Sequence, residues 1–283
     1  GGGVDMLRSS APGSVHVNLA DGITYNDGWG GVDTLFNIEN IRGGGNADTL
    51  TGDDGNNFIR GEGGNDLLQG AGGDDDFWGG SGNDFIEGGD GINYMLGGAG
   101  DDTIIGGSGT GDYIYAGGNG EGAFDYDVAS FSDATGSITA TLGAVATVSG
   151  AGVGTDTLSH IEYVRGGQFG DVFTVGVSFQ SSFSNKLDVE GLGGNDVITG
   201  NGETRVRFYK AEAGVTVDLA LGVSYGTDGL DTANVGWDTF SGVNRAWGSL
   251  FDDVLLGSAA NEEFRGDEGN DFIDGRGGTD RID

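Results

Sequence analysis

A nine-residue repeat in the first half of the chain constrains its fold more than any other feature. From residue 43 to residue 105 the sequence divides into seven consecutive units of nine, and every unit begins with Gly and has an apolar eighth residue. The fourth position is Gly in every unit except the first, where it is Asn46. The units read GGGNADTLT, GDDGNNFIR, GEGGNDLLQ, GAGGDDDFW, GGSGNDFIE, GGDGINYML and GGAGDDTII.

Each unit combines a glycine-rich turn with a very short strand. Glycine permits positive φ angles and hence tight turns, and the x-apolar-x triplet is a minimal strand whose central side chain points to one face. Two units make one coil of 18 residues, and successive coils stack as parallel strands about 4.8 Å apart. The repeat therefore predicts an all-β fold, a right-handed parallel β-roll solenoid with a slim core made from the eighth positions.

The sixth position carries polar residues that this stacking would bring together. One edge of the roll receives Asp48, Asp66, Asp84 and Asp102, and the other receives Asn57, Asp75, Asn93 and, after an insertion, Asp112. Carboxylates stacked this closely repel one another unless a cation lies between them. Calcium suits such a place because it takes six to eight hard oxygen ligands, and glycine-rich turns offer free backbone carbonyls.

The overall charge also calls for bound cations. The 283 residues include 45 Asp and Glu against 12 Lys and Arg, a net charge of −33, which opposes compaction and excludes a nucleic-acid partner. The chain has no Cys, so disulfides and thiol chemistry are absent, and its two His leave little room for zinc binding or histidine-based catalysis. No stretch approaches the length of an apolar membrane span.

GGSGNDFIE and GGAGDDTII resemble the calcium-binding nonapeptide GGxGxDxUx of the repeats-in-toxin (RTX) family. The resemblance implies a parallel β-roll in which calcium lies between successive turns, held by the Asp side chain and by carbonyls of the glycine-rich loop. The residues that match its ligand position are Asp48, Asp66, Asp75, Asp84 and Asp102. Asn57 and Asn93 depart from the motif, so we expect weaker calcium binding on their edge.

The nonapeptide pattern returns in two later parts of the chain. Near the end, position six is occupied by Asp253, Glu262, Asp271 and Asp280, among which Asp253 and Asp271 are the better-matched pair. In the middle, GGQFGDVFT and GLGGNDVIT contribute Asp171 and Asp196. These two lie 25 residues apart, so we do not expect them to stack in the 18-residue register. The remaining predicted calcium ligands are Asp112, Asp196, Asp253, Asp271 and Asp280.

A second, longer repeat separates the nonapeptide blocks. The pattern G-x-D-T-[LF]-x-x-[IV] begins at Gly31, Gly154 and Gly236, and each copy follows an alternating apolar stretch that is typical of a half-buried strand. These spacer cassettes resemble spacers of long secreted RTX proteins. We interpret them as wider coils of the same solenoid with Leu35, Ile38, Ile41 and their counterparts facing inward; a separate β-sandwich is the alternative.

These patterns divide the chain into alternating segments. Spacer cassettes are expected at 1–42, 125–165 and 201–247, RTX β-roll blocks at 43–124 and 248–283, and a short degenerate RTX block at 166–200. Solenoids need capping units at their ends. Neither end of the sequence contains one, so we expect the chain to be a segment of a longer protein.

Other motifs in the sequence do not indicate a function. GVSYG at residues 222–226 fits the serine-hydrolase pattern GxSxG but lacks an expected helix and a His partner, and the RGD at 265–267 falls within a nonapeptide. The four Trp residues are weak evidence for a carbohydrate-binding surface. We therefore expect no enzymatic activity.

The function expected from the sequence is calcium-dependent folding. Several calcium ions would order a structural or adhesive scaffold within a larger secreted or cell-surface bacterial protein, whose other partners would be further copies of itself or cell-surface and matrix components. The resemblance implies an extracellular location and type I secretion. The alternative is a non-catalytic C-terminal module of a secreted protease, lipase or alginate epimerase, for which catalytic motifs upstream would be the evidence.

Overall fold

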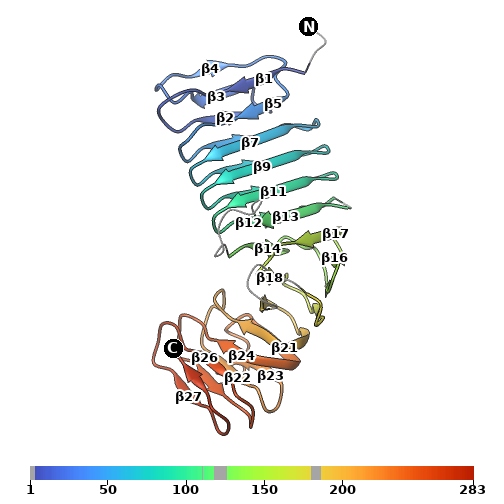
Figure 1. Ribbon diagram of the computed structural model, residues 1–283, viewed down its shortest axis with the longest axis vertical. Coiled ribbons are helices and arrows are strands. Elements are labelled where there is room, and N and C mark those ends of the chain that lie inside the picture. Colours follow the sequence, from blue (N-terminus) through green and yellow to red (C-terminus); the bar gives the residue numbers. More distant parts are fainter. Residues whose placement is uncertain (1–3, 110, 118–125, 180–185) are drawn as a thin grey trace. The chain divides into compact units, whose positions relative to one another are not determined.

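A computed structural model describes residues 4–109, 111–117, 126–179 and 186–283, and all of its regular elements are strands (Figure 1). No helix occurs among these residues, so none of them forms a helix that could cross a membrane. The chain divides into two compact units: residues 1–130 with 152–161, and residues 131–151 with 162–283. Most strand pairs are parallel, as a β-roll requires, which confirms the predicted fold class.

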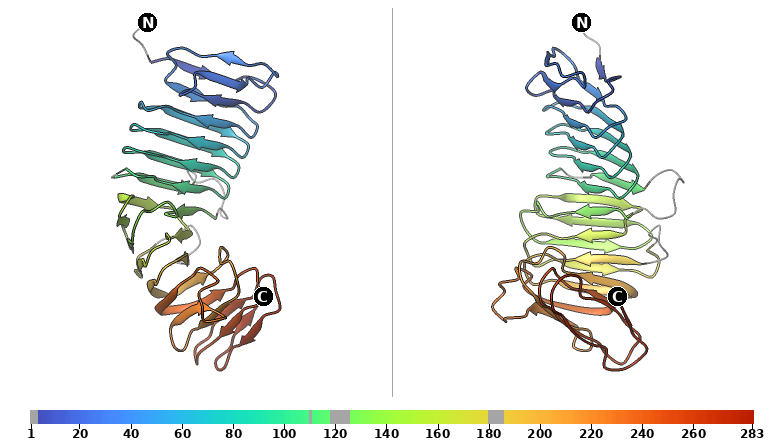
Figure 2. Two further views of the ribbon diagram at one scale, coloured as in Figure 1. Left: turned by 180° about the vertical axis from the view of Figure 1, so that it is seen from behind. Right: turned by 90° about the vertical axis from the view of Figure 1, so that its left-hand side faces the viewer.

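The first unit is built from two rows of parallel strands, visible as stacked rungs coloured blue to green in Figure 2. One row contains β2 (His16–Asn18), β6 (Thr49–Thr51), β8 (Leu67–Gln69), β10 (Phe85–Glu87), β12 (Thr103–Ile105) and β14 (Val128–Ser130). The other contains β1 (Met6–Arg8), β5 (Asn40–Arg42), β7 (Phe58–Gly63), β9 (Asp76–Ser81), β11 (Tyr94–Ala99), β13 (Tyr113–Gly117) and β17 (Gly154–Ser159).

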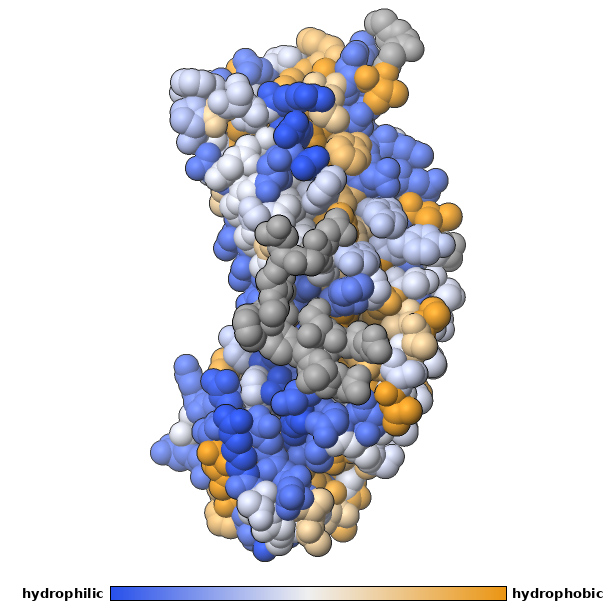
Figure 3. Space-filling model, viewed as in Figure 1, coloured by the Kyte–Doolittle hydropathy of each residue, from blue (hydrophilic) through white to orange (hydrophobic). Residues whose placement is uncertain are grey.

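The eighth positions form the core of this unit in the predicted 18-residue register. Leu50 pairs with Leu68 and Leu68 with Ile86, and in the other row Ile59 pairs with Phe77. The core residues of the seven repeats are almost completely buried: Leu50, Ile59, Leu68, Phe77, Ile86, Met95 and Ile104. Hydrophilic residues cover most of the face shown in Figure 3, with hydrophobic residues scattered among them.

The glycine at position four is required by the close approach of neighbouring turns. Gly82 has φ +117°, a conformation that side chains rarely adopt, and a Cβ there would overlap the carbonyl oxygen of Gly64 in the preceding coil. Asn46, which replaces this glycine in the first repeat, is not among the residues with positive φ. Glycine at this position therefore lets the turns stack as closely as the strands do.

The second unit contains three rows of parallel strands. The first row is β15 (Ile138–Leu142), β19 (Val172–Val175) and the first parts of β21 (Val197–Arg207) and β24 (Trp237–Trp247). The second is β18 (Tyr163–Arg165), β20 (Leu187–Glu190), the last parts of β21 and β24, β26 (Glu263–Arg265) and β28 (Arg281–Ile282). The third is β22 (Val215–Asp218), β25 (Val254–Leu256) and β27 (Phe272–Asp274).

Strands of the cassettes belong to these rows, as expected for coils of the roll. Each cassette also contains a hairpin that was not predicted from the sequence. The hairpins pair β2 with β3 (Ile23–Asn26), β15 with β16 (Ala146–Gly150), and β22 with β23 (Val223–Gly226). In addition, β3 pairs with β4 (Asp33–Thr34) and β23 pairs with the start of β24, both antiparallel. Of the predicted inward residues, Ile41 is buried, whereas Leu35 and Ile38 are only half-buried. Their counterparts in the second cassette, Leu158 and Ile161, are buried. Because cassette strands pair with strands of the rows, they do not make a separate sandwich.

Candidate metal centre

The position-six carboxylates of the first unit form a continuous ladder along one edge. The backbone N–H of Asp48 donates to Oδ1 of Asp66 at 2.7 Å, Asp66 donates to Asp84 at 2.8 Å, and Asp84 donates to Asp102 at 2.8 Å. The ladder begins at Val15, whose N–H donates to Asp48 at 2.8 Å. Residues predicted to lie above one another 18 positions apart therefore do so, and each uses one carboxylate oxygen to hold the neighbouring turn.

The opposite edge has the same hydrogen-bond pattern but less charge. The N–H of Asn57 donates to Asp75 at 2.7 Å, Asp75 donates to Oδ1 of Asn93 at 3.0 Å, and Asn93 donates to Asp112 at 2.7 Å. An amide oxygen replaces a carboxylate oxygen without loss of the bond. The two Asn residues therefore preserve the stacking while removing negative charge that a cation would need.

The second carboxylate oxygen of the ladder is available for a ligand. Oδ2 atoms of Asp66, Asp75 and Asp84 are buried and have no hydrogen-bond partner among the residues that the structure describes. A Cβ built at the first glycine of each turn would overlap this oxygen: at Gly79, for example, it would meet both Asp84 Oδ2 and the carbonyl oxygen of Gly97. Carboxylate and carbonyl oxygens from two successive coils thus converge where the glycine lacks a side chain.

Burial makes these carboxylates costly to ionise while no cation is present. Desolvation raises the pKa of Asp66 to about 7, and repulsion from Asp84 and Asp48 contributes in the same direction. Desolvation likewise raises the pKa of Asp75 to about 7 and that of Asp84 to about 6. A divalent cation beside these oxygens would reverse the shift, because an opposite charge stabilises the ionised form.

Any metal site here depends on the backbone as well as on side chains. No group of three or more His, Cys, Asp and Glu residues with metal-binding geometry exists within the described ranges. The remaining ligands would have to be carbonyl oxygens of the glycine-rich turns. Calcium is the common protein metal that accepts such a mixed oxygen set in a flexible geometry.

The second unit has a ladder of its own, and one expectation about it is wrong. The N–H of Asp171 donates to Oδ1 of Asp196 at 2.7 Å, so these residues do stack although they lie 25 positions apart. Register is kept because Val172 still pairs with Val197. Coil length varies without changing the stacking of the turns.

The final repeats contain two different edges. Asp253 donates its N–H to Asp271 at 3.0 Å, and Glu262 donates to Asp280 at the same distance, so both predicted pairs stack. At the second edge Arg276 donates hydrogen bonds to Asp218 and to the carbonyl oxygen of Gly257. A guanidinium therefore supplies positive charge beside the turn in which Glu replaces Asp.

Among the residues that the structure describes, four ladder aspartates were not predicted as ligands. The N–H of Asp102 donates to Asp127 at 2.9 Å, and that of Asp112 donates to Asp156 at 3.2 Å. In the second unit Asp171 and Asp238 occupy equivalent places. The signal for Asp156 and Asp238 was present in the sequence, because G-x-D-T corresponds to positions four to seven of the nonapeptide.

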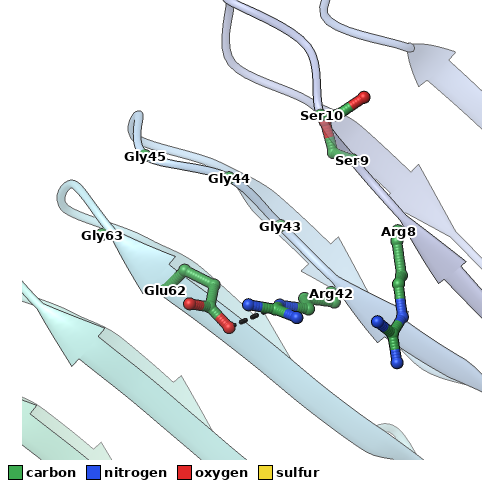
Figure 4. A pocket seen from close by; sticks show the side chains of 9 residues that line it. All are labelled: Arg8, Ser9, Ser10, Arg42, Gly43, Gly44, Gly45, Glu62 and Gly63. Carbon is green, nitrogen blue, oxygen red and sulfur yellow. Dashed lines mark ion pairs between the residues drawn. The ribbon is translucent and has the colours of Figure 1, made fainter.

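The first unit also contains a pocket of about 610 Å³ whose lining differs from the carboxylate ladder. It is lined by arginine, serine and glycine residues together with Glu62. Arg42 points toward Glu62 and forms an ion pair with it at 2.6 Å, whereas Arg8 lies apart from that pair (Figure 4). Its lining contains no Asp and no His, so it does not resemble the carboxylate ladder.

A comparison with protein families supports the interpretation of the ladder as a candidate calcium site. The family described as RTX calcium-binding nonapeptide repeat (4 copies) matches residues 42–77, 78–113, 188–203, 238–268 and 256–283. These segments contain most of the stacked turns described above. No curated protein matches the chain significantly. The chain therefore carries RTX calcium-binding nonapeptide repeats, and these repeats fold as a β-roll.

Proposed function

We propose that the chain is a segment that folds on binding several calcium ions and then serves as a structural or adhesive scaffold of a larger secreted or cell-surface bacterial protein. The observation that carries the proposal is the set of buried Oδ2 atoms that face glycine carbonyls of the next coil. The proposed ligands are Asp48, Asp66, Asp75, Asp84, Asp102, Asp112, Asp196, Asp253, Asp271 and Asp280.

The charge of the chain supports control of folding by calcium. With a net charge of −33 and buried carboxylates of raised pKa, the roll is disfavoured at neutral pH in the absence of cations. Bound calcium supplies positive charge between neighbouring turns. Sites of extracellular modules commonly have dissociation constants of about 10⁻⁴ to 10⁻³ M, so the chain would stay unfolded inside cells and fold outside them.

A scaffold role is supported by the way the ladders are organised. They run through the nonapeptide blocks and the cassettes alike, as the bonds to Asp156 and Asp238 illustrate. Coils that contact only their neighbours leave faces of each unit exposed, which suits contacts with further copies or with surface components.

Circular dichroism of the metal-depleted chain during calcium titration tests this proposal. We expect a spectrum of a disordered chain without calcium and a strand-rich spectrum at millimolar calcium, reversed by a chelator. Isothermal titration then counts the ions. An identical strand-rich spectrum with and without chelator would refute calcium-dependent folding.

A further inference from the structure

A small cavity lies in the first cassette, among residues of β1 to β5 and of the segments between them. Its volume is about 190 Å³. The lining residues Val17 and Thr24 are almost completely buried and form its floor, whereas Arg8, Trp29 and Asp33 are exposed at its rim. Pockets for drug-sized ligands commonly have volumes of about 300–1,000 Å³, so this cavity suits a single small ring.

The loop that carries Trp29 is held in shape by its own hydrogen bonds. Oδ1 of Asp27 accepts the N–H of Trp29 and that of Gly31, each at 2.8 Å, and Oδ1 of Asn26 accepts the N–H of Gly28 at 3.0 Å. Gly28 has φ +80°, which permits the sharp bend before Trp29. The indole is 73% exposed and makes no ring contact elsewhere in the described part of the chain. A ligand that packs on an indole held in this way costs little conformational entropy.

The polar groups of the cavity are balanced in charge. Two guanidinium groups, Arg8 and Arg42, and two carboxylates, Asp27 and Asp33, line it. Within the described ranges, neither Arg8 nor Asp33 forms an ion pair, whereas Arg42 pairs with Glu62. Guanidinium groups only donate hydrogen bonds and carboxylates only accept them. The lining therefore matches a ligand whose hydroxyl groups both donate and accept.

The cavity adjoins the pocket of about 610 Å³, and the two share part of their lining. Arg8, Ser9, Ser10 and Arg42 line both. Arg8 and Arg42 lie opposite each other on the neighbouring strands β1 and β5, and Figure 4 shows them with the two serines. A ligand made of several linked rings can therefore place one ring in the small cavity and extend over the larger pocket.

We propose that this cavity binds one unit of a neutral oligosaccharide, whose further units lie along the larger pocket. The C–H groups on one face of the sugar ring pack on the indole of Trp29, and its hydroxyl groups exchange hydrogen bonds with Arg8 and Asp33. The net charge of −33 favours a neutral saccharide over an acidic one. The proposal deepens the adhesive form of the proposed function by naming a ligand class, and it rests on that function only in requiring a folded roll.

The experiment measures saccharide binding to the full chain in millimolar calcium, by saturation-transfer NMR and isothermal titration. The probes are neutral trisaccharides of glucose, galactose, mannose and N-acetylglucosamine, with trigalacturonate as the acidic counterpart of galactotriose. Trp29→Ala and Arg8→Gln are the test variants. Trp237→Ala is the matched control, because Trp237 is an exposed tryptophan that does not line the cavity.

We expect neutral trisaccharide to bind more tightly than trigalacturonate. Trp29→Ala should weaken this binding by about tenfold or more, and Arg8→Gln should weaken it as well, while Trp237→Ala leaves it unchanged. The inference is overturned if no neutral probe binds, if only trigalacturonate binds, or if Trp29→Ala binds as tightly as Trp237→Ala.

Circular dichroism of the same samples separates this inference from the proposed function. A strand-rich spectrum that persists in chelator would refute calcium-dependent folding and leave the saccharide result valid. Calcium-induced folding without saccharide binding would overturn the inference alone. If Trp29→Ala does not fold, Arg8→Gln decides the matter by the same comparison with Trp237→Ala.

Discussion

Protons should partly replace calcium in the roll, because the ladder carboxylates are buried. The pKa of Asp66 is about 7 in the folded, metal-free chain, compared with an ordinary value of 3.8. A difference of about 3 pH units corresponds to about 4 kcal/mol. Asp75 has a similar shift and Asp84 a somewhat smaller one. Ionising these three carboxylates in the folded, metal-free chain therefore costs several kcal/mol, which is a large fraction of the roughly 5–15 kcal/mol stability of a typical domain.

The direction of the pH dependence follows from these shifts. A carboxyl group with a higher pKa in the folded chain binds its proton more tightly there, so folding becomes more favourable as the pH falls from about 7 toward about 4. If three such groups each take up a proton, stability rises by up to about 4 kcal/mol per pH unit within that window. Calcium-free chain should therefore gain strand structure on mild acidification.

Circular dichroism of the metal-depleted chain between about pH 7.5 and about pH 4.5 measures this effect. Asp84→Asn removes one of the titrating ladder carboxylates and should lower the slope by up to about 1.4 kcal/mol per pH unit. Asp54→Asn removes the same charge from an exposed position and should leave the slope unchanged. A disordered spectrum at every pH, or equal slopes in the two variants, would refute the reasoning.

Four further substitutions in the first unit test the calcium sites and the core. Asp84→Ala should raise the calcium concentration at the midpoint of folding more than Asn93→Ala does. Both variants lose a hydrogen bond, but only Asp84→Ala loses a ligand charge. Equal shifts in a calcium titration would contradict the assignment of the two residues to edges of different calcium affinity. Gly79→Ala should reduce calcium affinity and thermal stability, because its Cβ would overlap Asp84 Oδ2 and the Gly97 carbonyl; unchanged calcium binding would count against the proposed cradle. Ile86→Ala should lower the free energy of unfolding in saturating calcium by about 2–5 kcal/mol, because Ile86 is fully buried in the core. Denaturant titration measures this loss, and a negligible loss would show that the core contributes little to stability.

The amino-acid sequence was sufficient for the regular part of the molecule. Each coil contacts only the coils before and after it, so the nine-residue period predicted the strand pairs, the buried eighth positions and the stacking of Asp66 on Asp84. These features depend on local spacing alone. The same spacing argument failed for Asp171 and Asp196, because it assumed that every coil has 18 residues.

Only the tertiary structure decided how the irregular coils join the roll. Stacking requires that turns and strands stay in register, but it does not limit the length of the loops and hairpins between them. The chain therefore accommodates hairpins in the cassettes and still places Asp156 and Asp238 on the ladders. The pairing of Asp196 with Asp238 across 42 residues depends on contacts between separate strands, which no local period in the sequence encodes.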